Sequence, residues 1–185
     1  MKILIPLAEG FEEIEAITVI DILRRADIEV VIASLKEGQV EGAHKIKMLP
    51  DTSMDKINQS EVDGIVLPGG FPGFENLGND DRVLNTVRQM DKEGKYIAAI
   101  CGAPSVLINA GILQGRKATI NPAGKAQLEA CAKYSEDRVV VDGKLITSKS
   151  PGTAMEFALK LVEVLAGEEK MKQIKAQTIA ICKGD

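Results

Sequence analysis

Aromatic residues, histidine and runs of basic residues are scarce in this sequence. Its 185 residues include no tryptophan, two tyrosines, four phenylalanines and one histidine. Nucleic-acid surfaces depend on clustered basic side chains and on aromatic rings that stack with bases. Since the net charge is −4 and charges of both signs are interspersed, we expect no nucleic-acid partner.

Cysteine is also rare. Cys101, Cys131 and Cys182 are widely spaced and odd in number, which disfavours a disulfide framework and favours a reducing, cytoplasmic location. Three scattered cysteines and one histidine do not make a structural zinc site, so we predict no metal. We expect Cys131 and Cys182 to have structural or incidental roles.

Long uninterrupted hydrophobic runs are absent. Residues 96–115 carry no charge and are numerous enough to span a membrane, but glycine, proline and polar residues interrupt them. The first five of these residues are typical of a buried strand instead. The N-terminal MKILIPLAEG has too short an apolar core for a secretory signal. The sequence therefore predicts no membrane segment.

What the sequence does contain fits an ordinary globular protein. Hydrophobic residues make up 45% and charged residues 27% of a chain that is long enough for one sizeable core. No repeat, low-complexity linker or composition shift divides it. We therefore predict a single domain over residues 1–185.

Short apolar runs alternate with longer amphipathic segments along the chain. The predicted strands are residues 2–7, 28–34, 64–67, 96–100, 117–120 and 145–148. The predicted helices are residues 11–26, 80–93, 103–110, 122–132, 151–166 and 168–176. Residues 37–50 indicate an irregular excursion with a small hairpin, followed by a short helical stretch at 52–57. This alternation is typical of an α/β fold with a parallel sheet covered on both faces.

Ligands of open parallel sheets bind beyond the carboxyl ends of the strands. Three features fall at that edge. A helix with several glutamates in its first turns follows strand 2–7, a Pro-Gly-Gly turn follows strand 64–67, and Cys101 follows strand 96–100. The fold thus brings an acid, a glycine turn and a thiol to one rim.

Cys101 stands where a buried strand must turn into a helix. The small neighbours Gly102 and Ala103 suit such a crowded corner. Backbone N–H groups at the start of the following helix favour a thiolate, so we predict a lowered thiol pKa. The alternative is a small buried apolar residue, as most free cysteines are. On these residues alone, the signal is weak.

Glu15 lies on a helix that is apolar over most of its surface. Such a helix is covered on more than its sheet-facing side, which favours a subunit interface. A carboxyl among these residues would lose water, acquire a raised pKa and remain protonated as a hydrogen-bond donor. The alternative is a solvated surface glutamate, which we expect for Glu12 and Glu13. Position alone does not show which of Glu12, Glu13 and Glu15 is buried.

Gly69 and Gly70 follow Pro68 at the end of a strand. Adjacent N–H groups in such a turn can form an oxyanion hole, although a plain turn is the alternative. A Cys–His dyad needs a histidine beside the thiol. The only histidine, His44, lies in the irregular excursion, so unless it folds over Cys101 the thiolate must depend on the helix and on Glu15.

Four motifs carry a resemblance to a known family. They are EGFEEIEAITVIDILRRA, VLPGGFPGFENL, AAICGAPSVL and SEDRVVVDGKLITSKSPGTAMEFALKLVE. Together and in this order they resemble the ThiJ/PfpI superfamily, most of all the branch of the parkinsonism-associated protein deglycase and its bacterial relatives. The resemblance spans essentially the whole chain. It implies a flavodoxin-like three-layer α/β sandwich, with a mostly parallel sheet and helices on both faces, and a homodimer.

The same resemblance assigns roles to residues of the site. It implies that Cys101 is the nucleophile and Glu15 its acid–base partner, with the N–H groups of the glycine turn (Gly69 and Gly70) and of Gly102 near the oxyanion position. It implies no cofactor. Several relatives carry a histidine where this chain has Asn121, which cannot shuttle protons near neutral pH. A histidine-based mechanism is therefore in doubt here.

Four residues complete the predicted surroundings of the site. The peptidase branch has a histidine at the position of Gly102, which argues against proteolysis. His44 and Arg25 are candidates for positive charge near a partner subunit's site, although we favour His44 as an interface or surface residue. Pro151 opens a long helix and is expected to serve capping and packing, with a place in the pocket wall as the alternative.

The resemblance implies a glutathione-independent glyoxalase or protein deglycase. Its substrates would be methylglyoxal, glyoxal or their early adducts with proteins. The alternative is a redox sensor or oxidative-stress chaperone, in which Cys101 is oxidised to a sulfinate that protonated Glu15 stabilises. A third hypothesis is an interaction module in which Cys101 has no chemical role.

Overall fold

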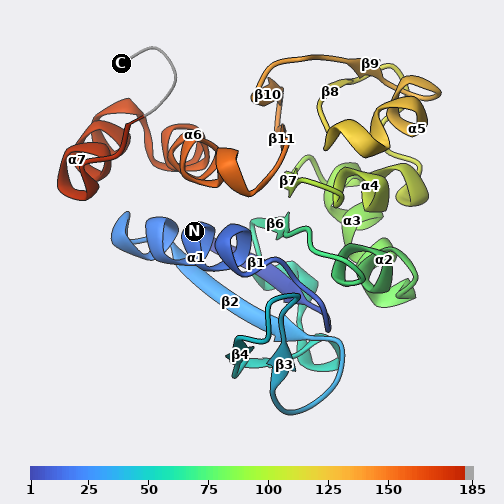
Figure 1. Ribbon diagram of the computed structural model, residues 1–185. Helices are drawn as coiled ribbons and strands as arrows, with labels where there is room; N and C mark the ends of the chain where they lie inside the picture. Colours follow the sequence, from blue (N-terminus) through green and yellow to red (C-terminus); the bar gives the residue numbers. More distant parts are fainter. Residues whose placement is uncertain (182–185) are drawn as a thin grey trace.

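The centre of the protein is a seven-stranded sheet (Figure 1). The computed structural model describes residues 1–181. The strands of the sheet are β1 (Lys2–Leu7), β2 (Glu29–Ser34), β5 (Thr52–Ser53), β6 (Gly64–Leu67), β7 (Tyr96–Ile100), β10 (Val139–Asp142) and β11 (Leu145–Ser148). Their order is β10-β11-β7-β6-β1-β2-β5. Every neighbouring pair is parallel except β10 with β11.

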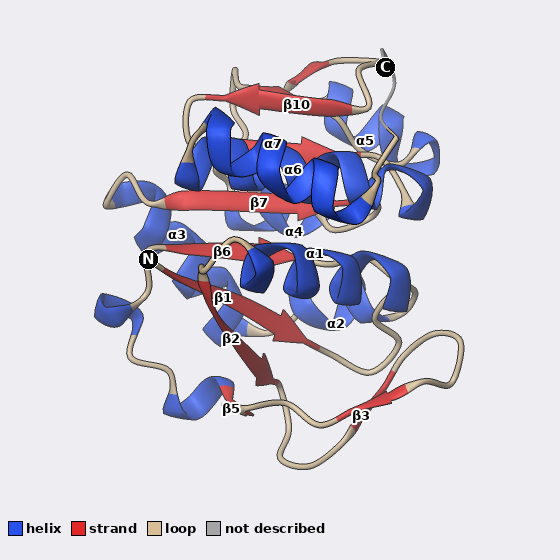
Figure 2. Cartoon of the chain, turned by 90° about the vertical axis from the view of Figure 1, so that its left-hand side faces the viewer, coloured by secondary structure: helices blue, strands red, loops and turns tan. Residues whose placement is uncertain are grey.

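Helices cover both faces of this sheet, as the second view shows (Figure 2). One face carries α1 (Glu13–Arg25), α6 (Ala154–Ala166) and α7 (Glu168–Thr178). The other carries α2 (Gly73–Gly78), α3 (Asp81–Lys92), α4 (Pro104–Ala110) and α5 (Lys125–Glu129). The predicted flavodoxin-like α/β sandwich is confirmed.

Side chains of β1 alternate between two hydrophobic cores because successive residues of a strand point to opposite faces. Ile3 packs in the core that contains Val19 of α1 and Phe157 of α6. Leu4 packs in the opposite core with Val87 of α3. These two cores fix the ends of β1, β6 and β7 at one edge, and that edge holds the reactive corner.

Most predicted strands are confirmed, but the strand at 117–120 is not part of the main sheet. Only Lys117–Ala118 (β8) is extended, and it pairs in parallel with Lys133–Tyr134 (β9) in a separate two-stranded sheet. The Thr119 N–H donates to the hydroxyl of Thr147 at 2.9 Å instead of to a strand carbonyl. Strand β10 pairs with β11 at this edge of the sheet instead. From the sequence, β10 was not predicted as a strand. Its signal was the Asp-Gly pair that follows it, typical of a tight hairpin.

The excursion at 37–50 contains the expected hairpin, formed by β3 (Val40–Glu41) and β4 (Lys47–Met48). The predicted short helix at 52–57 is only partly right, because β5 precedes a 3₁₀ turn at Met54–Lys56. The predicted helices at 122–132 and 151–166 both begin with a 3₁₀ turn. Helix α2 was not predicted, and Cys182 lies outside the described residues.

Within residues 1–181, no helix combines the length and the hydrophobicity that a membrane crossing requires.

Candidate active site

Cys101 occupies a strained backbone corner between β7 and α4. Its φ of 64° lies in the left-handed region, which is rare for a residue other than glycine and persists only where neighbours hold it. Two hydrogen bonds do so. The Cys101 N–H donates to the Ser148 carbonyl at 3.0 Å, and the Cys101 carbonyl accepts from the Asn121 N–H at 2.8 Å. The predicted corner geometry is confirmed.

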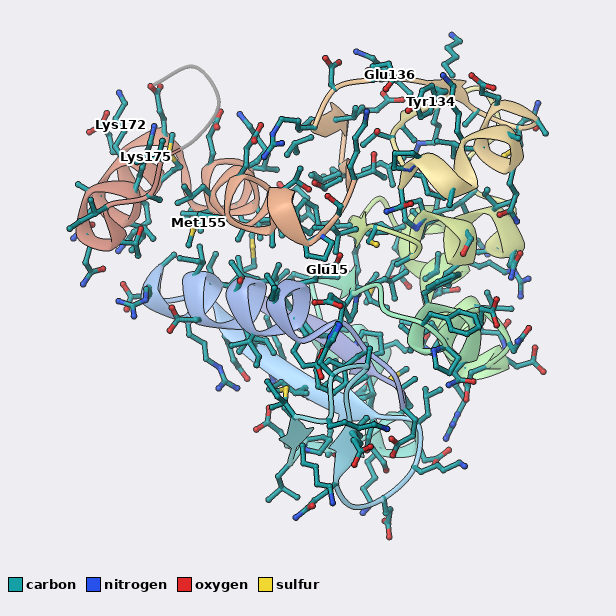
Figure 3. All side chains as sticks on the ribbon, viewed as in Figure 1. Glu15, Tyr134, Glu136, Met155, Lys172 and Lys175 are labelled. Carbon is teal, nitrogen blue, oxygen red and sulfur yellow. The ribbon has the colours of Figure 1, made fainter. Side chains whose placement is uncertain are left out.

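Glu15 lies in the interior, where the first turns of α1 meet the sheet edge (Figure 3). Its side chain is fully buried. Oε2 accepts the Gly69 N–H at 2.8 Å, whereas Oε1 has no hydrogen-bond partner among residues 1–181. A β-carbon added to Gly69 would fall 2.6 Å from Glu15 Oε2 and 2.7 Å from Cys101 Cβ. Only glycine therefore lets the carboxyl and the thiol approach each other here.

The pKa of Glu15 is raised to about 7 because the carboxyl is buried. The Gly69 N–H and the thiol of Cys101 lower it in part, and the charge of Glu12 raises it. The raised pKa predicted for Glu15 is confirmed. At neutral pH this carboxyl is poised between its two protonation states.

The thiol behaves differently from the prediction. Burial raises the pKa of Cys101 to about 12, and the charge and hydrogen bonding of Glu15 raise it as well. The Gly102 N–H and the Asn121 amide lower it less. The predicted lowering is therefore wrong for the state in which Glu15 is ionised. Helix α4 has only seven residues, and its dipole does not outweigh burial beside a carboxylate.

Because the pKa of the thiol is raised well above that of the carboxyl, the pair carries a single proton just above neutral pH. The proton rests mainly on the sulfur. When it moves to Glu15, the carboxyl becomes neutral and no longer repels the thiolate. Proton transfer within the pair, rather than a permanently ionised thiol, is the chemistry that this geometry supports.

The two glycines of the turn differ in whether their backbone N–H groups are free. The Gly69 N–H is already bound to Glu15, so its predicted oxyanion role is wrong. Gly70 has a φ of 93°, and a β-carbon there would fall 2.2 Å from the Glu12 nitrogen. The Gly70 N–H makes no hydrogen bond within residues 1–181. The oxyanion role of Gly70 and Gly102 stays a prediction.

A hollow of about 470 Å³ opens beside Cys101. Asn121 lines it, with its amide Nδ2 3.7 Å from the Cys101 sulfur. The rings of Phe71 and Phe74 lie on its other side, with their centroids 6.4 Å apart. Phe74 also packs over Gly102, where a β-carbon would fall 2.6 Å from the ring. The predicted proximity of Asn121 to the thiol is confirmed.

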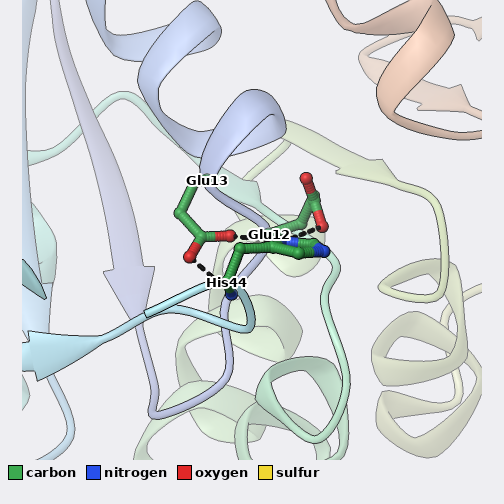
Figure 4. Close-up of side chains that lie close together, drawn as sticks. All are labelled: Glu12, Glu13 and His44. Carbon is green, nitrogen blue, oxygen red and sulfur yellow. Dashed lines mark hydrogen bonds and ion pairs between the residues drawn. The ribbon is translucent and has the colours of Figure 1, made fainter. Parts of the chain in front are cut away.

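The sequence led us to expect Glu12 and Glu13 to be solvated surface residues. This expectation is wrong, because only 7% and 4% of their surfaces are exposed. The Glu13 carboxylate accepts the backbone N–H of His44 at 2.7 Å and faces its ring Nδ1 at 2.9 Å (Figure 4). Glu12 Oε2 lies 3.5 Å from the same ring nitrogen. His44 itself is 70% exposed, as a surface residue should be.

This trio is the one group within residues 1–181 whose ligand atoms are near enough to share a metal ion. Both oxygens of Glu13 already accept hydrogen bonds, and its Oε1 also takes the Ile46 N–H at 3.4 Å. The arrangement is that of an ion pair that fastens the β3–β4 hairpin to α1.

Arg25 and Pro151 do not line the hollow. Arg25 is exposed and binds Asp21 at 2.7 Å in the last turn of α1. It is therefore about 15 Å along the helix from Glu15, at 1.5 Å per residue. Pro151 begins a 3₁₀ turn that a capping box of Ser150 and Thr153 closes. Pro151 therefore has no place in the wall of this hollow, whereas the role of Arg25 toward a partner subunit's site stays a prediction.

Sequence reasoning missed the residues of α2. Phe74 and Glu75 line the hollow from this helix, together with Gln127 of α5. The stretch PGFENLG contains two glycines and a proline, so it did not indicate a helix. The two neighbouring aromatic residues in an otherwise aromatic-poor chain were the available signal.

Residues 1–164 match the family described as "DJ-1/PfpI family". The chain belongs to the DJ-1/PfpI family. It is 43% identical over 180 residues to the Arabidopsis thaliana "Protein DJ-1 homolog B", covering 96% of this chain and 41% of that protein. The chain thus spans less than half the length of this relative.

Other DJ-1/PfpI proteins match over nearly their full length. The Caenorhabditis elegans "Glutathione-independent glyoxalase DJR-1.2" is 37% identical over 172 residues, covering 93% of this chain and 91% of that protein. The crystal structure of Drosophila melanogaster DJ-1beta superposes with a TM-score of 0.94 at 42% identity and covers 98% of both chains. These similarities therefore show both the family and the fold of this chain.

Proposed function

We propose that this DJ-1/PfpI protein is a cofactor-free thiol enzyme that converts methylglyoxal or glyoxal, free or as early protein adducts, into 2-hydroxy acids. The observation that carries the proposal is the Glu15–Cys101 pair, whose thiol lines an accessible hollow and whose carboxyl has a pKa near 7. A relative named as a glutathione-independent glyoxalase supports the reaction class.

The first step joins the thiol to the aldehyde. Ionised Glu15 takes the Cys101 proton while the sulfur adds to the aldehyde carbon, and the carbonyl oxygen becomes an alkoxide. The N–H groups of Gly70 and Gly102 stabilise this charge. Glu15 then returns the proton to the alkoxide, which gives a hemithioacetal and leaves the carboxylate free.

The second step moves a proton between adjacent carbons. Glu15 removes the hydrogen of the former aldehyde carbon as a proton and delivers it to the neighbouring carbon, which turns the hemithioacetal into a thioester of the hydroxy acid. Water then hydrolyses the thioester, releasing lactate or glycolate and restoring the thiol. The sum is one dicarbonyl and one water per hydroxy acid, with no external oxidant. Asn121 positions the oxygen or the water without shuttling protons.

The test is formation of lactate from methylglyoxal without glutathione. We expect Cys101→Ala to abolish turnover and Glu15→Gln to lower kcat about 100-fold or more. Cys131→Ala is the matched control, because this half-buried thiol bonds only to carbonyls of its own helical segment. Wild-type turnover no faster than that of Cys101→Ala would refute the proposal.

A second candidate function is redox sensing. It is favoured by the unpartnered Glu15 Oε1, which in the protonated carboxyl could donate to a sulfinate oxygen. Two molecules of peroxide would convert the thiol into a sulfinate and release two waters. A gain of two oxygens at Cys101 after mild peroxide, reduced in Glu15→Gln, would support sensing. If neither oxidation nor turnover depended on Cys101, an interaction module would be favoured.

We also propose a homodimer in the cytosol. Ile14 and Ile17 project from α1 with 56% and 42% of their surface exposed, and paired apolar residues of this kind on a helix favour a partner. Cys101 and Cys131 are both free, which supports a reducing compartment. Sedimentation of wild type and Ile17→Glu tests the dimer: a wild-type monomer at micromolar concentration would refute it.

A further inference from the structure

The hollow at Cys101 continues into a second one. A hollow of about 260 Å³ adjoins it and shares four lining residues, namely Phe74, Glu75, Ser105 and Gln127. The two form one groove that starts at the sulfur and runs outward past α2 and α4, which lie side by side (Figure 1). This groove is much larger than a small dicarbonyl such as methylglyoxal requires. Its outer half is free to contact another part of the substrate.

The charges along this groove have one sign. Among the residues that line the two hollows, the only ionisable carboxyl groups are Glu12 and Glu75, and no lysine, arginine or histidine lines either. Several remaining polar residues, such as Asn109 and Gln127, carry neutral amides. A bound group with positive charge would therefore meet no cationic side chain among the residues that line the two hollows.

Glu75 is the carboxylate without a counter-ion. Within residues 1–181 its side chain forms no ion pair and no hydrogen bond, although most acidic side chains here are paired. Glu12, in contrast, faces the His44 ring. Glu75 lies beside Phe74 on α2, and the faces of Phe71 and Phe74 offer a cation further attraction.

The reactive end of the groove is the Cys101 thiol, and Glu15 lies beside this thiol without lining either hollow. Glu15 Oε1 is buried and unbonded next to Cys101. The groove therefore presents the Cys101 thiol at its reactive end and an unpaired carboxylate in its shared section. A substrate with a carbonyl at one end, for the thiol to attack, and a cation at the other would match both.

We propose that the groove selects carbonyl substrates that carry a positive charge, and that Glu75 is the residue that determines this specificity. The inference rests on the proposed function for its reaction and extends it to the substrate's second group. The substrate class is a 2-oxoaldehyde, or its adduct, linked to an ammonium or guanidinium group. An anionic counterpart of the same size is disfavoured by both carboxylates.

The first test compares substrates that share the reacting group and carry opposite charges. We would measure kcat/KM for phenylglyoxals that carry a para-trimethylammonio or a para-carboxylate group. We expect wild type to prefer the cation, and Glu75→Gln to lower the cation-to-anion ratio about fivefold, which corresponds to about 1 kcal/mol. Glu129→Gln removes the same charge from neighbouring α5, outside both hollows, and should leave the ratio unchanged.

The second test needs no catalysis. In a Cys131→Ala, Cys182→Ala background, Cys101 is labelled with cationic and anionic methanethiosulfonates, from which the thiolate displaces methanesulfinate to form a mixed disulfide. The ratio of the two rates reports the charge along the groove. We expect Glu75→Gln to lower this ratio several-fold and Glu129→Gln to leave it unchanged.

The outcomes separate the two proposals. If methylglyoxal is converted but both ratios are the same in wild type and Glu75→Gln, the specificity inference is wrong and the proposed function stands. If the labelling ratio falls in Glu75→Gln but no dicarbonyl is converted, the groove's charge preference stands and the proposed function is wrong. Equal effects of Glu75→Gln and Glu129→Gln would also overturn the inference, because the effect would then be one of net charge.

Discussion

Glu13 and Glu15 are two residues apart on α1, and both carboxyl groups are buried, yet their pKa values move in opposite directions. Burial raises the pKa of Glu13, but hydrogen bonds from the His44 ring and from nearby backbone N–H groups outweigh it and leave the pKa below its usual value. Glu15 has one N–H donor and a thiol, so burial dominates. Burial alone therefore does not decide a carboxyl's state; the number of donors around it does.

The largest expected change in stability comes from the substitution of Glu15. Its folded pKa of about 7 exceeds the ordinary value of 4.5, so its ionisation destabilises the fold increasingly as pH rises from about 4.5 to 7. Glu15→Gln should therefore stabilise the protein at pH 8 by about 3 kcal/mol, at about 1.4 kcal/mol per pH unit between the two pKa values. Urea unfolding at pH 8 and pH 4 measures this difference.

The control at pH 4 is part of that prediction, because neutral Glu15 and glutamine then differ little. Equal stabilisation at both pH values would show that packing, rather than ionisation, explains the result. No stabilisation at pH 8 would contradict the raised pKa itself.

Substitution of Glu13 is expected to change stability by a smaller amount and in the opposite direction. Its folded pKa is lowered, so it contributes stability that is present above its unfolded pKa and lost as pH falls through the folded pKa. Glu13→Gln should destabilise the protein by about 1 to 2 kcal/mol at pH 7, because it weakens charge-assisted hydrogen bonds to the hairpin. Thermal unfolding checks this, with Glu41→Gln as control, since Glu41 is a half-buried carboxylate of the same hairpin that pairs with Lys45 instead of His44. Equal effects of the two variants would contradict the assignment.

The smallest expected effect is on the pKa of His44, whose ring contacts Glu13. The hydrogen bond to Glu13 raises the pKa of His44 above its ordinary 6.5. The protonated ring of His44 therefore contributes stability that is present below the unfolded pKa and is lost as pH rises through the folded pKa. His44 is the only histidine, so its ring signals in an NMR titration are unambiguous. We expect the pKa to fall toward 6.5 in Glu13→Gln, and an unchanged value would break the link between them.

The sheet and the reactive corner could be predicted because their signals are local. Apolar runs that alternate with helices indicate the sandwich, and a thiol after strand 96–100 indicates an exposed corner. The burial of Glu12 and Glu13 could not be predicted, because the hairpin that covers them packs from 30 residues away. The direction of the Cys101 pKa was missed for the same reason, since it depends on how closely Gly69 lets Glu15 approach.

The groove residues of α2 illustrate a second limit. A helix as short as Gly73–Gly78 leaves no periodic pattern, and its glycines indicate a turn. Phe74 fits there only because Gly102, on another element, leaves space for the ring. Such complementarity between two distant residues exists only in the folded chain, so a single sequence does not display it.

The clamp on the backbone of Cys101 makes its reactivity a property of the finished fold. Its N–H and carbonyl are held by Ser148 and Asn121, two segments that follow it in the chain. A nascent chain that has not yet added these residues carries an ordinary thiol. The unusual sulfur therefore emerges only after β11 has joined the sheet, and a thiol-specific reagent can report when that happens.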